Sequence, residues 1–226
     1  MAELMARGWS SSRDEVHTAD VVLLRHGDTR LTPQRRFSGV GSADPGLSAI
    51  GRDQARQAAG SAVLRGRPFE EILTSPMARC QETAQILAAS LGVSVRIDPS
   101  LLEMDFGLWE GLTFDDVQQR YPEDLQRWKE SAWVSPTGSS DTFAAVLDRM
   151  RSAAERFATR YAGASVVAVT HVTPVKALVA DALGAPPSRI VSHGALVRLL
   201  LTDHLHRRGG LLAAVERHLT PALIPR

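Results

Sequence analysis

Short apolar runs alternate with longer amphipathic stretches along most of the chain. A short apolar run bounded by polar residues is typical of a buried strand, and apolar residues at a spacing of three to four are typical of a helix. Strands are predicted at residues 21–24, 71–75, 93–97, 164–170 and 195–201. Helices are predicted at residues 47–64, 77–91, 142–161 and 174–183, with two shorter ones at 113–121 and 122–131.

Local signals support several of these boundaries. Ser48 is suited to cap the start of the first helix, because its hydroxyl can accept a free backbone N–H. Gly92 and Gly184 follow two of the predicted helices, where a left-handed residue commonly ends a helix. Proline, glycine and serine gather at residues 135–140 and predict a loop before the long helix.

This order of elements predicts an α/β fold, a three-layer α/β/α sandwich around a mostly parallel central sheet. We expect residues 19–226 to form a single domain and the serine-rich residues 1–18 to form a disordered leader. Residues 104–140 look like an insertion that caps one edge of the sheet. Residues 207–210 look like a turn, and the segment after Leu211 fits either a strand or a helix.

Composition and charge exclude several classes of function. The 226 residues include 26 Lys+Arg and 25 Asp+Glu, so a nucleic-acid partner or a polybasic membrane surface is not expected. No apolar run approaches the roughly 18 residues of a membrane span, and the first twenty residues lack an apolar core of the signal-peptide type. Cys80 is the single cysteine, so no intramolecular disulfide can form. We expect a cytoplasmic protein.

Polar side chains follow three of the predicted strands. Arg25 and His26 follow the first strand, Arg79 lies in the first turn of the helix after the second, and His171 follows the strand at 164–170. Ligands of open α/β sheets bind beyond the carboxyl ends of the strands. We therefore expect two histidines and two arginines to meet at one edge of the sheet.

These residue types favour chemistry on a phosphate group. Guanidinium groups are forked, permanently charged donors that match phosphate oxygens. A histidine between them could act as a general base, a metal ligand or a nucleophile. Metal ligation is disfavoured, because the arginines repel a cation and no aspartate adjoins either histidine. Nearby arginines favour the neutral imidazole that a nucleophile requires. Glu103, in the loop after the third strand, can reach the same rim and act as a general acid.

Four blocks of sequence, in a fixed order, carry a resemblance to a known family. The blocks are Leu24-Arg25-His26-Gly27-Asp28-Thr29, followed by Arg36-Phe37-Ser38-Gly39 with Leu47-Ser48 and Gly51; Ser75-Pro76-Met77-Ala78-Arg79 with Thr83-Ala84; Glu103 with Gly107 and Trp109-Glu110-Gly111; and Val169-Thr170-His171. They resemble the histidine phosphatase superfamily, also called phosphoglycerate mutase-like. The resemblance extends from about Val21 to Leu201.

The resemblance assigns a role to each strand-end residue. It implies that His26 is the phosphoryl-accepting nucleophile, that Arg25, Arg79 and His171 hold the phosphate, and that Glu103 is the acid and base. It further implies substrate contacts at Thr32, Ser38, Gly39 and Thr173, with no metal and no cofactor. The implied partner is a small-molecule phosphate monoester, and the implied assembly is a monomer or a homodimer.

Within the superfamily the chain resembles the phosphatase branch, in particular alpha-ribazole phosphatases and the acid phosphatase domain of actinobacterial ribonuclease H fusions. The segment Glu103-Met104-Asp105-Phe106 differs from the Glu-Arg-His-Tyr-like run of the mutases. A phosphoglycerate mutase-type phosphotransferase stays the alternative within enzymes. A non-catalytic phosphate-binding scaffold is the alternative from another class, although such relatives tend to lose the nucleophile or a clamp.

Two departures and several simpler interpretations accompany the resemblance. Thr32 stands where the family often has asparagine, and Ser139-Ser140-Asp141 stands where it often has Gly-Gly-Glu. We expect Trp109 to pack within the cap and Cys80 to be a small buried residue. His193, His204, His206 and His218 match no motif.

Overall fold

A single twisted sheet forms the centre of the molecule in the computed structural model, which describes residues 18–41, 43–184, 196–202 and 216–217. Within these ranges the strand order is β3-β2-β4-β1-β5-β6. The first four of these strands run parallel, and β5 and β6 run antiparallel to their neighbours. The strands are β1 (Thr18–Arg25), β2 (Glu71–Thr74), β3 (Ser94–Ile97), β4 (Ser165–Thr170), β5 (Leu196–Thr202) and β6 (Glu216–Arg217).

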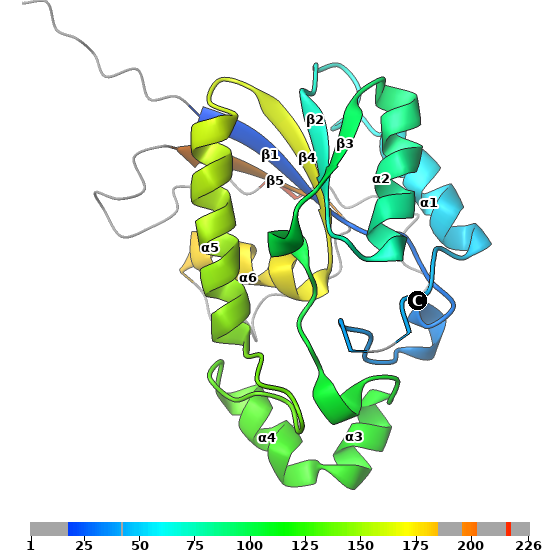
Figure 1. Ribbon diagram of the computed structural model, residues 1–226, viewed down its shortest axis with the longest axis vertical. Coiled ribbons are helices and arrows are strands. Elements are labelled where there is room, and N and C mark those ends of the chain that lie inside the picture. Colours follow the sequence, from blue (N-terminus) through cyan, green and yellow to red (C-terminus); the bar gives the residue numbers. More distant parts are fainter. Residues whose placement is uncertain (1–17, 42, 185–195, 203–215, 218–226) are drawn as a thin grey trace, which may run out of the picture.

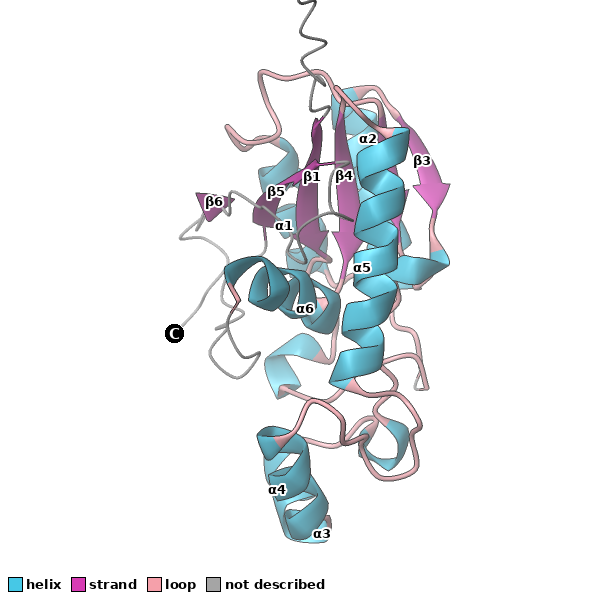
Figure 2. Ribbon diagram, turned by 90° about the vertical axis from the view of Figure 1, so that its left-hand side faces the viewer, coloured by secondary structure: helices cyan, strands magenta, loops and turns pink. Residues whose placement is uncertain are grey.

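Helices cover both faces of this sheet, so the predicted three-layer α/β/α sandwich is confirmed. In Figure 1, α1 and α2 lie on one side of the strands and α5 and α6 on the other, and Figure 2 shows α5 and α6 in front of the sheet. Two short helices, α3 and α4, lie beyond the carboxyl ends of the parallel strands (Figure 1). The helices are α1 (Ala49–Ala59), α2 (Ala78–Leu91), α3 (Phe114–Arg120), α4 (Pro122–Glu130), α5 (Phe143–Arg160) and α6 (Val172–Leu183). In the described part of the chain, 3-10 turns lie at Thr32–Gln34, Pro99–Leu101 and Gly107–Trp109.

Alternation along β1 explains why its apolar run is continuous. Val21 and Leu23 are buried in the cluster that includes residues of α5 and α6, whereas Val22 and Leu24 are buried in the cluster that includes residues of α1 and α2. Successive side chains of a strand point to opposite faces. A strand covered by helices on both sides must therefore be apolar at every position.

The first helix is shorter than predicted. Ser48 caps it as expected by accepting the Gly51 N–H, but α1 ends at Ala59 rather than at residue 64. Gly60 ends the helix, and turns follow. Val63 and Leu64 are nevertheless buried, so their apolar character continued the helical pattern past the actual helix end.

Two other boundaries differ by a few residues. β1 begins at Thr18, three residues before the predicted strand. α6 begins at Val172 and includes Pro174 in its first turn. Proline is tolerated there because the backbone N–H groups of the first turn have no partner within the helix.

The other boundaries agree closely with the prediction. Gly92 and Gly184 adopt left-handed conformations after α2 and α6, as predicted. Three parts of the prediction lie outside the described residues: residues 1–17, the turn at 207–210, and the histidines His193, His204, His206 and His218. No helix within the described ranges is long and apolar enough to cross a membrane.

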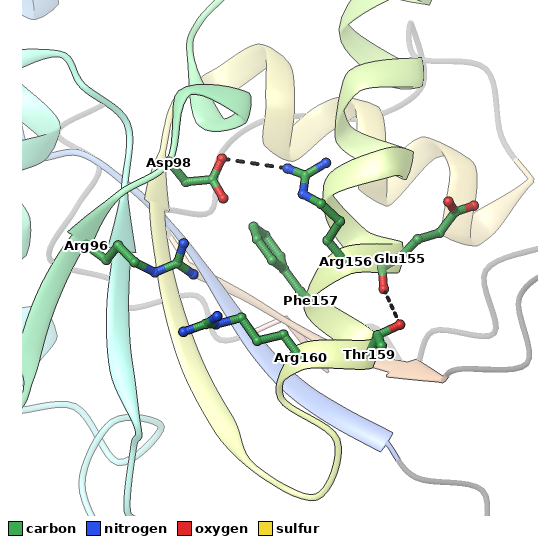
Figure 3. Close-up of a pocket in the computed structure, with 7 residues that line it drawn as sticks. All are labelled: Arg96, Asp98, Glu155, Arg156, Phe157, Thr159 and Arg160. Atoms are coloured by element: carbon green, nitrogen blue, oxygen red, sulfur yellow. Dashed lines mark hydrogen bonds and ion pairs between the residues drawn. The ribbon is translucent and has the colours of Figure 1, made fainter.

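A groove of about 520 Å³ lies between β3 and α5 (Figure 3). Its lining residues are Arg96, Asp98, Glu155, Arg156, Phe157, Thr159 and Arg160. Arg96 and Arg160 both donate to the Tyr161 hydroxyl, which in turn donates to the buried carboxylate of Glu71. Because Glu71 opens β2, this network ties β2, β3 and α5 together at the amino end of the sheet. This network stabilises the fold and lies away from the strand ends that carry the predicted chemistry.

Candidate active site

The pairing of β1 with β4 brings the two motif histidines together. Arg25 lies opposite Thr170 in this parallel register, and the His26 N–H donates to the Thr170 carbonyl at 3.0 Å. His26 and His171 therefore leave neighbouring strands at the same height. Their ring centroids are 5.2 Å apart.

A hydrogen bond fixes the tautomer of His26. Its Nδ1 lies 2.8 Å from the Gly27 carbonyl oxygen, which can only accept, so Nδ1 carries the proton and Nε2 keeps its lone pair. Burial, and then the positive charges of Arg25 and Arg79, hold the pKa of His26 well below its usual range. The ring is therefore neutral, with its unprotonated nitrogen available to attack an electrophile.

Gly27 is required for this local geometry. A Cβ at this position would overlap the carbonyl oxygen of Gly51, at the start of α1. The Gly27 N–H also donates to the Thr83 hydroxyl of α2 at 3.2 Å. The turn after β1 is thus held between α1 and α2, and the imidazole has little freedom to move.

Arg79, in the first turn of α2, is almost completely buried. Its Nη2 donates to the carbonyl oxygens of Ser38 at 3.1 Å and Gly39 at 3.4 Å, and its Nη1 pairs with Asp44 at 3.1 Å. The other oxygen of Asp44 accepts the Ala78 N–H at 2.6 Å. One carboxylate thus caps α2 and orients the guanidinium.

Three buried donors at this site have no partner. Among the described residues, five buried side-chain polar atoms lack a hydrogen bond, and three of these are Arg25 Nε, Arg79 Nε and Ser38 Oγ. A buried N–H or O–H group without an acceptor is costly, so such groups commonly mark the position of a ligand. Because two of the donors belong to cations, an oxyanion such as phosphate is the acceptor that suits them best.

Glu103 lies against the same cluster on a loop that contacts α6. Its carboxyl group is buried and accepts the backbone N–H groups of Met104 at 2.9 Å and Thr173 at 3.3 Å. Burial raises the pKa of Glu103, while these hydrogen bonds and the charge of Arg79 oppose that rise. Arg149 of α5 donates to the carbonyls of Ser100 and Leu102 and so fixes the loop that carries Glu103.

His171 is fully buried between β2 and α2. Its Nε2 lies 2.8 Å from the Ser75 hydroxyl and 3.4 Å from the Cys80 sulfur. Burial, with the nearby His26 ring and Arg79, holds the pKa of His171 well below its usual range. Cys80 is buried as expected, and burial raises the pKa of its thiol. Its contact with His171 was not predicted.

Of the residues predicted to touch substrate, some contact the predicted catalytic residues and one does not. Ser38 and Gly39 form the loop that holds Arg79, and Thr173 donates its backbone N–H to Glu103. The Thr32 hydroxyl instead accepts the Thr29 N–H at 3.0 Å within its own turn. The shorter side chain that replaces asparagine is thus engaged in local structure.

An aromatic cluster joins Phe37 to side chains of the segment predicted to form a cap. Trp109 is fully buried and packs on Phe37 and Trp128, as expected of a packing residue.

Within the described residues, no three histidine, cysteine, aspartate or glutamate side chains gather in a way that could hold a metal ion.

Sequence reasoning missed the carboxylate that orients Arg79. Asp44 lies in a loop before α1, 35 residues from its arginine partner. An aspartate before a proline in a loop is a common turn signal, and no local pattern distinguishes one that caps a distant helix.

Comparisons with known proteins show which family this chain belongs to. A family model described as histidine phosphatase superfamily (branch 1) matches residues 21–190. The bifunctional protein Rv2228c of Mycobacterium tuberculosis is 40% identical over 194 residues, which are 86% of this chain and 50% of that protein. Phosphoserine phosphatase 1 of Hydrogenobacter thermophilus is 30% identical over 192 residues, covering 85% of this chain and 89% of the relative.

A solved structure of similar shape is the mycobacterial glucosyl-3-phosphoglycerate phosphatase. It superposes with a TM-score of 0.74 at 27% identity, covering 90% of this chain and 99% of that one. The chain spans about half the length of the mycobacterial curated relatives it matches.

Proposed function

Because the chain belongs to the histidine phosphatase superfamily, branch 1, we propose that it is a metal-independent phosphomonoesterase that acts through a phosphohistidine on His26. One observation carries this proposal: the lone pair of His26 Nε2 faces away from Gly27, in a site with unpartnered guanidinium donors on Arg25 and Arg79. A neutral nucleophile and a cationic cradle are what transfer of a phosphoryl group requires.

In the first step, Nε2 of His26 attacks phosphorus, and the bond from phosphorus to the substrate oxygen breaks. Arg25, Arg79 and His171 hold the phosphoryl oxygens while negative charge redistributes. The protonated carboxyl of Glu103 gives its proton to the leaving alkoxide, since burial favours the protonated form. The products are a free alcohol and a phosphohistidine.

In the second step, the Glu103 carboxylate takes a proton from water, and the water oxygen attacks phosphorus. The phosphorus–nitrogen bond breaks, and its electron pair returns to Nε2 of His26. Inorganic phosphate leaves, and Glu103 is protonated again. The arginines supply the positive charge that Mg²⁺ supplies in other phosphoryl-transfer enzymes, so the proposed reaction needs no metal.

The proposed substrates are small phosphorylated metabolites. The names of two relatives mention phosphoserine and glucosyl-3-phosphoglycerate, so both compounds belong in a substrate panel. Residues 104–140 would form a cap over the bound ester, since α3 and α4 lie beyond the strand ends (Figure 1). We further propose a cytoplasmic monomer or homodimer with no nucleic-acid partner.

A mutase is the weaker alternative. Relatives of about 30% identity include probable phosphoglycerate mutases, which supports a shared transfer step. The hydrophobic Met104 and Phe106 that follow Glu103 are buried and offer a second phosphate-bearing substrate no charge. Incubation with 3-phosphoglycerate separates the two functions, because a hydrolase releases inorganic phosphate and a mutase yields 2-phosphoglycerate.

The test is to trap the phosphoenzyme in the presence of EDTA. Wild-type protein mixed with labelled p-nitrophenyl phosphate should release nitrophenolate and carry an acid-labile, alkali-stable label. His26→Ala should keep its fold by circular dichroism and carry no label. Turnover near the wild-type rate in His26→Ala would contradict the mechanism. If the wild-type protein binds phosphate but shows no turnover, the non-catalytic scaffold is favoured instead.

A further inference from the structure

Glu110, a partly buried carboxylate in the loop before α3, accepts several backbone hydrogen bonds. Its Oε1 accepts the N–H of Gly39 at 3.0 Å, of Phe106 at 3.2 Å and of Gly41 at 3.4 Å. Its Oε2 accepts the Gly39 N–H at 2.8 Å. One carboxylate therefore joins three backbone groups from two segments that are far apart in the chain.

The two segments already run side by side next to Glu110. Phe37 donates its N–H to the Leu112 carbonyl at 2.9 Å, and the Gly111 N–H donates back to Phe37 at the same distance. The Arg36 guanidinium adds a bond to the Gly111 carbonyl at 2.6 Å. Backbone-to-backbone pairing ends at Phe37. Beyond it, the Glu110 carboxylate accepts the N–H groups of Gly39 and Gly41 and so holds the loop at residues 38–41.

Gly39 shows how closely the loop is held. A Cβ at this position would overlap the Met104 carbonyl oxygen and Oε1 of Glu110. Only glycine permits this approach, so the loop backbone lies directly on the segment that carries Glu110.

The loop held by Glu110 is also the loop that orients Arg79. The carbonyl of Gly39 accepts from Arg79 Nη2 at 3.4 Å, and that of Ser38 accepts from the same atom at 3.1 Å. The N–H of Gly39 thus binds Glu110 while its carbonyl binds Arg79. A shift of this peptide would move the guanidinium, whose Nε has no protein partner.

We propose that Glu110 is a positioning residue that sets the Arg79 guanidinium for its anion by fixing the peptide groups of Ser38 and Gly39. The proposal rests on the proposed role of Arg79 as a phosphate clamp. Glu110 itself does not donate a proton to substrate, because its oxygens are occupied by backbone donors. Truncation of Glu110 should lower anion affinity chiefly through Arg79, with a smaller part through the Ser38 hydroxyl on the same loop.

The experiment measures inorganic phosphate binding by isothermal titration calorimetry, so it does not depend on turnover. Glu110→Ala should weaken phosphate binding by about 10- to 100-fold, the effect expected of a clamp displaced by roughly 1 Å. Glu110→Gln keeps an acceptor oxygen and should therefore lose less phosphate affinity than Glu110→Ala. Asp53→Ala is the matched control, because it removes an exposed carboxylate of α1 that pairs with Arg56 and has no contact with Arg79 or its loop. It should leave phosphate affinity unchanged.

Double variants separate positioning from general loosening of the fold. In an Arg79→Ala background, Glu110→Ala should have a much smaller effect, because the guanidinium it orients is gone and only the Ser38 hydroxyl on the same loop remains to be displaced. In an Arg25→Ala background, Glu110→Ala should lower phosphate affinity by the same factor as it does in the wild type. Equal losses in both backgrounds, or unchanged affinity in the single variant, would overturn the proposal.

Failure of the proposed function gives a different result. If the wild type forms no phosphoenzyme but shows this pattern of phosphate affinities, the hydrolase mechanism is wrong and the role of Glu110 stands. If Glu110→Ala does not fold, the same comparisons are made with Glu110→Gln, whose smaller loss of phosphate affinity must again shrink in the Arg79→Ala background.

Discussion

At the scale of single residues, the site separates two titrating groups by environment. Burial and two guanidiniums hold the pKa of His26 well below its usual range, so the imidazole is neutral. Burial raises the pKa of Glu103, so the carboxyl keeps its proton to higher pH than usual. A neutral nucleophile and a protonated acid therefore coexist at pH values above the pKa of His26 and below that of Glu103.

Glu103→Gln should slow phosphoenzyme formation in a way that depends on the leaving group. An alkyl alkoxide needs a proton as it leaves, whereas nitrophenolate is stable as an anion. General acid catalysis is worth about 10²–10⁴-fold, so formation should fall by about that factor for alkyl phosphates and little for p-nitrophenyl phosphate. Rapid-quench kinetics measure the formation step apart from hydrolysis. Equal losses for both esters would show that Glu103 is not the donor, and Asp105 would be tested next.

The pH dependence should follow from the same two groups. The rate of phosphoenzyme formation from an alkyl phosphate should rise as His26 loses its proton, at a pH below the usual histidine value of about 6.5. It should fall as Glu103 loses its proton, at a pH above the usual value of about 4.3. Stopped-flow pH profiles of wild type and Glu103→Gln test this assignment. An alkaline limb that persists in Glu103→Gln would belong to another group.

At the scale of elements, opposite ends of the sheet have different tasks. The carboxyl ends of β1, β2 and β4 lead directly to His26, Ser75 and His171. β2 begins at Glu71, whose carboxylate joins β3 and α5 through Arg96 and Tyr161. Stability and chemistry can therefore be altered separately.

Tyr161→Phe should destabilise the protein without changing catalysis. The variant removes a hydroxyl that donates to Glu71 and accepts from two arginines, and loss of such a bond to a charged group costs about 1.5–3 kcal/mol. Urea unfolding should show a lower free energy of unfolding, with kcat/KM for p-nitrophenyl phosphate near the wild-type value. A large fall in kcat/KM of the folded variant would mean that this network reaches the active site.

At the scale of the whole molecule, burying a neutral histidine links stability to pH. The pKa of His171 is held well below its usual value by burial in the folded chain, whereas an unfolded chain restores a value near 6.5. Below about pH 6.5 the unfolded state therefore binds a proton that the folded state does not. The free energy of unfolding should fall as pH falls through this range, by at most about 1.4 kcal/mol per pH unit for this residue.

His171→Gln tests this linkage, because glutamine does not titrate. Denaturant unfolding at pH 7.5 and 5.5 should show a smaller loss of stability in His171→Gln than in wild type. Glu103 acts with the opposite sign, since its raised pKa favours folding at lower pH, but both proteins retain it. Parallel losses in the two proteins would contradict the assignment to His171.

The sequence determined the elements and the place of the chemistry. Periods of two and of about 3.6 residues are local properties, so they predict most strands and helices to within a few residues. Parallel strands share one carboxyl edge, so the strand ends alone are enough to bring Arg25, His26 and His171 together. The error in the end of α1 arose because Val63 and Leu64, buried after a turn at Gly60, continue the helical pattern.

The tertiary structure decided how these residues are held. Asp44 meets Arg79 across 35 residues, Glu110 meets Gly39 across 71, and Ser75 meets His171 across 96. No sequence period or cap signal extends over such separations, because these contacts depend on how loops pack once the sheet has formed. Thr32 illustrates the same limit, since only the packed turn shows that its hydroxyl accepts from Thr29. The order of residues along the chain decides which groups reach the strand ends, and packing decides their orientation.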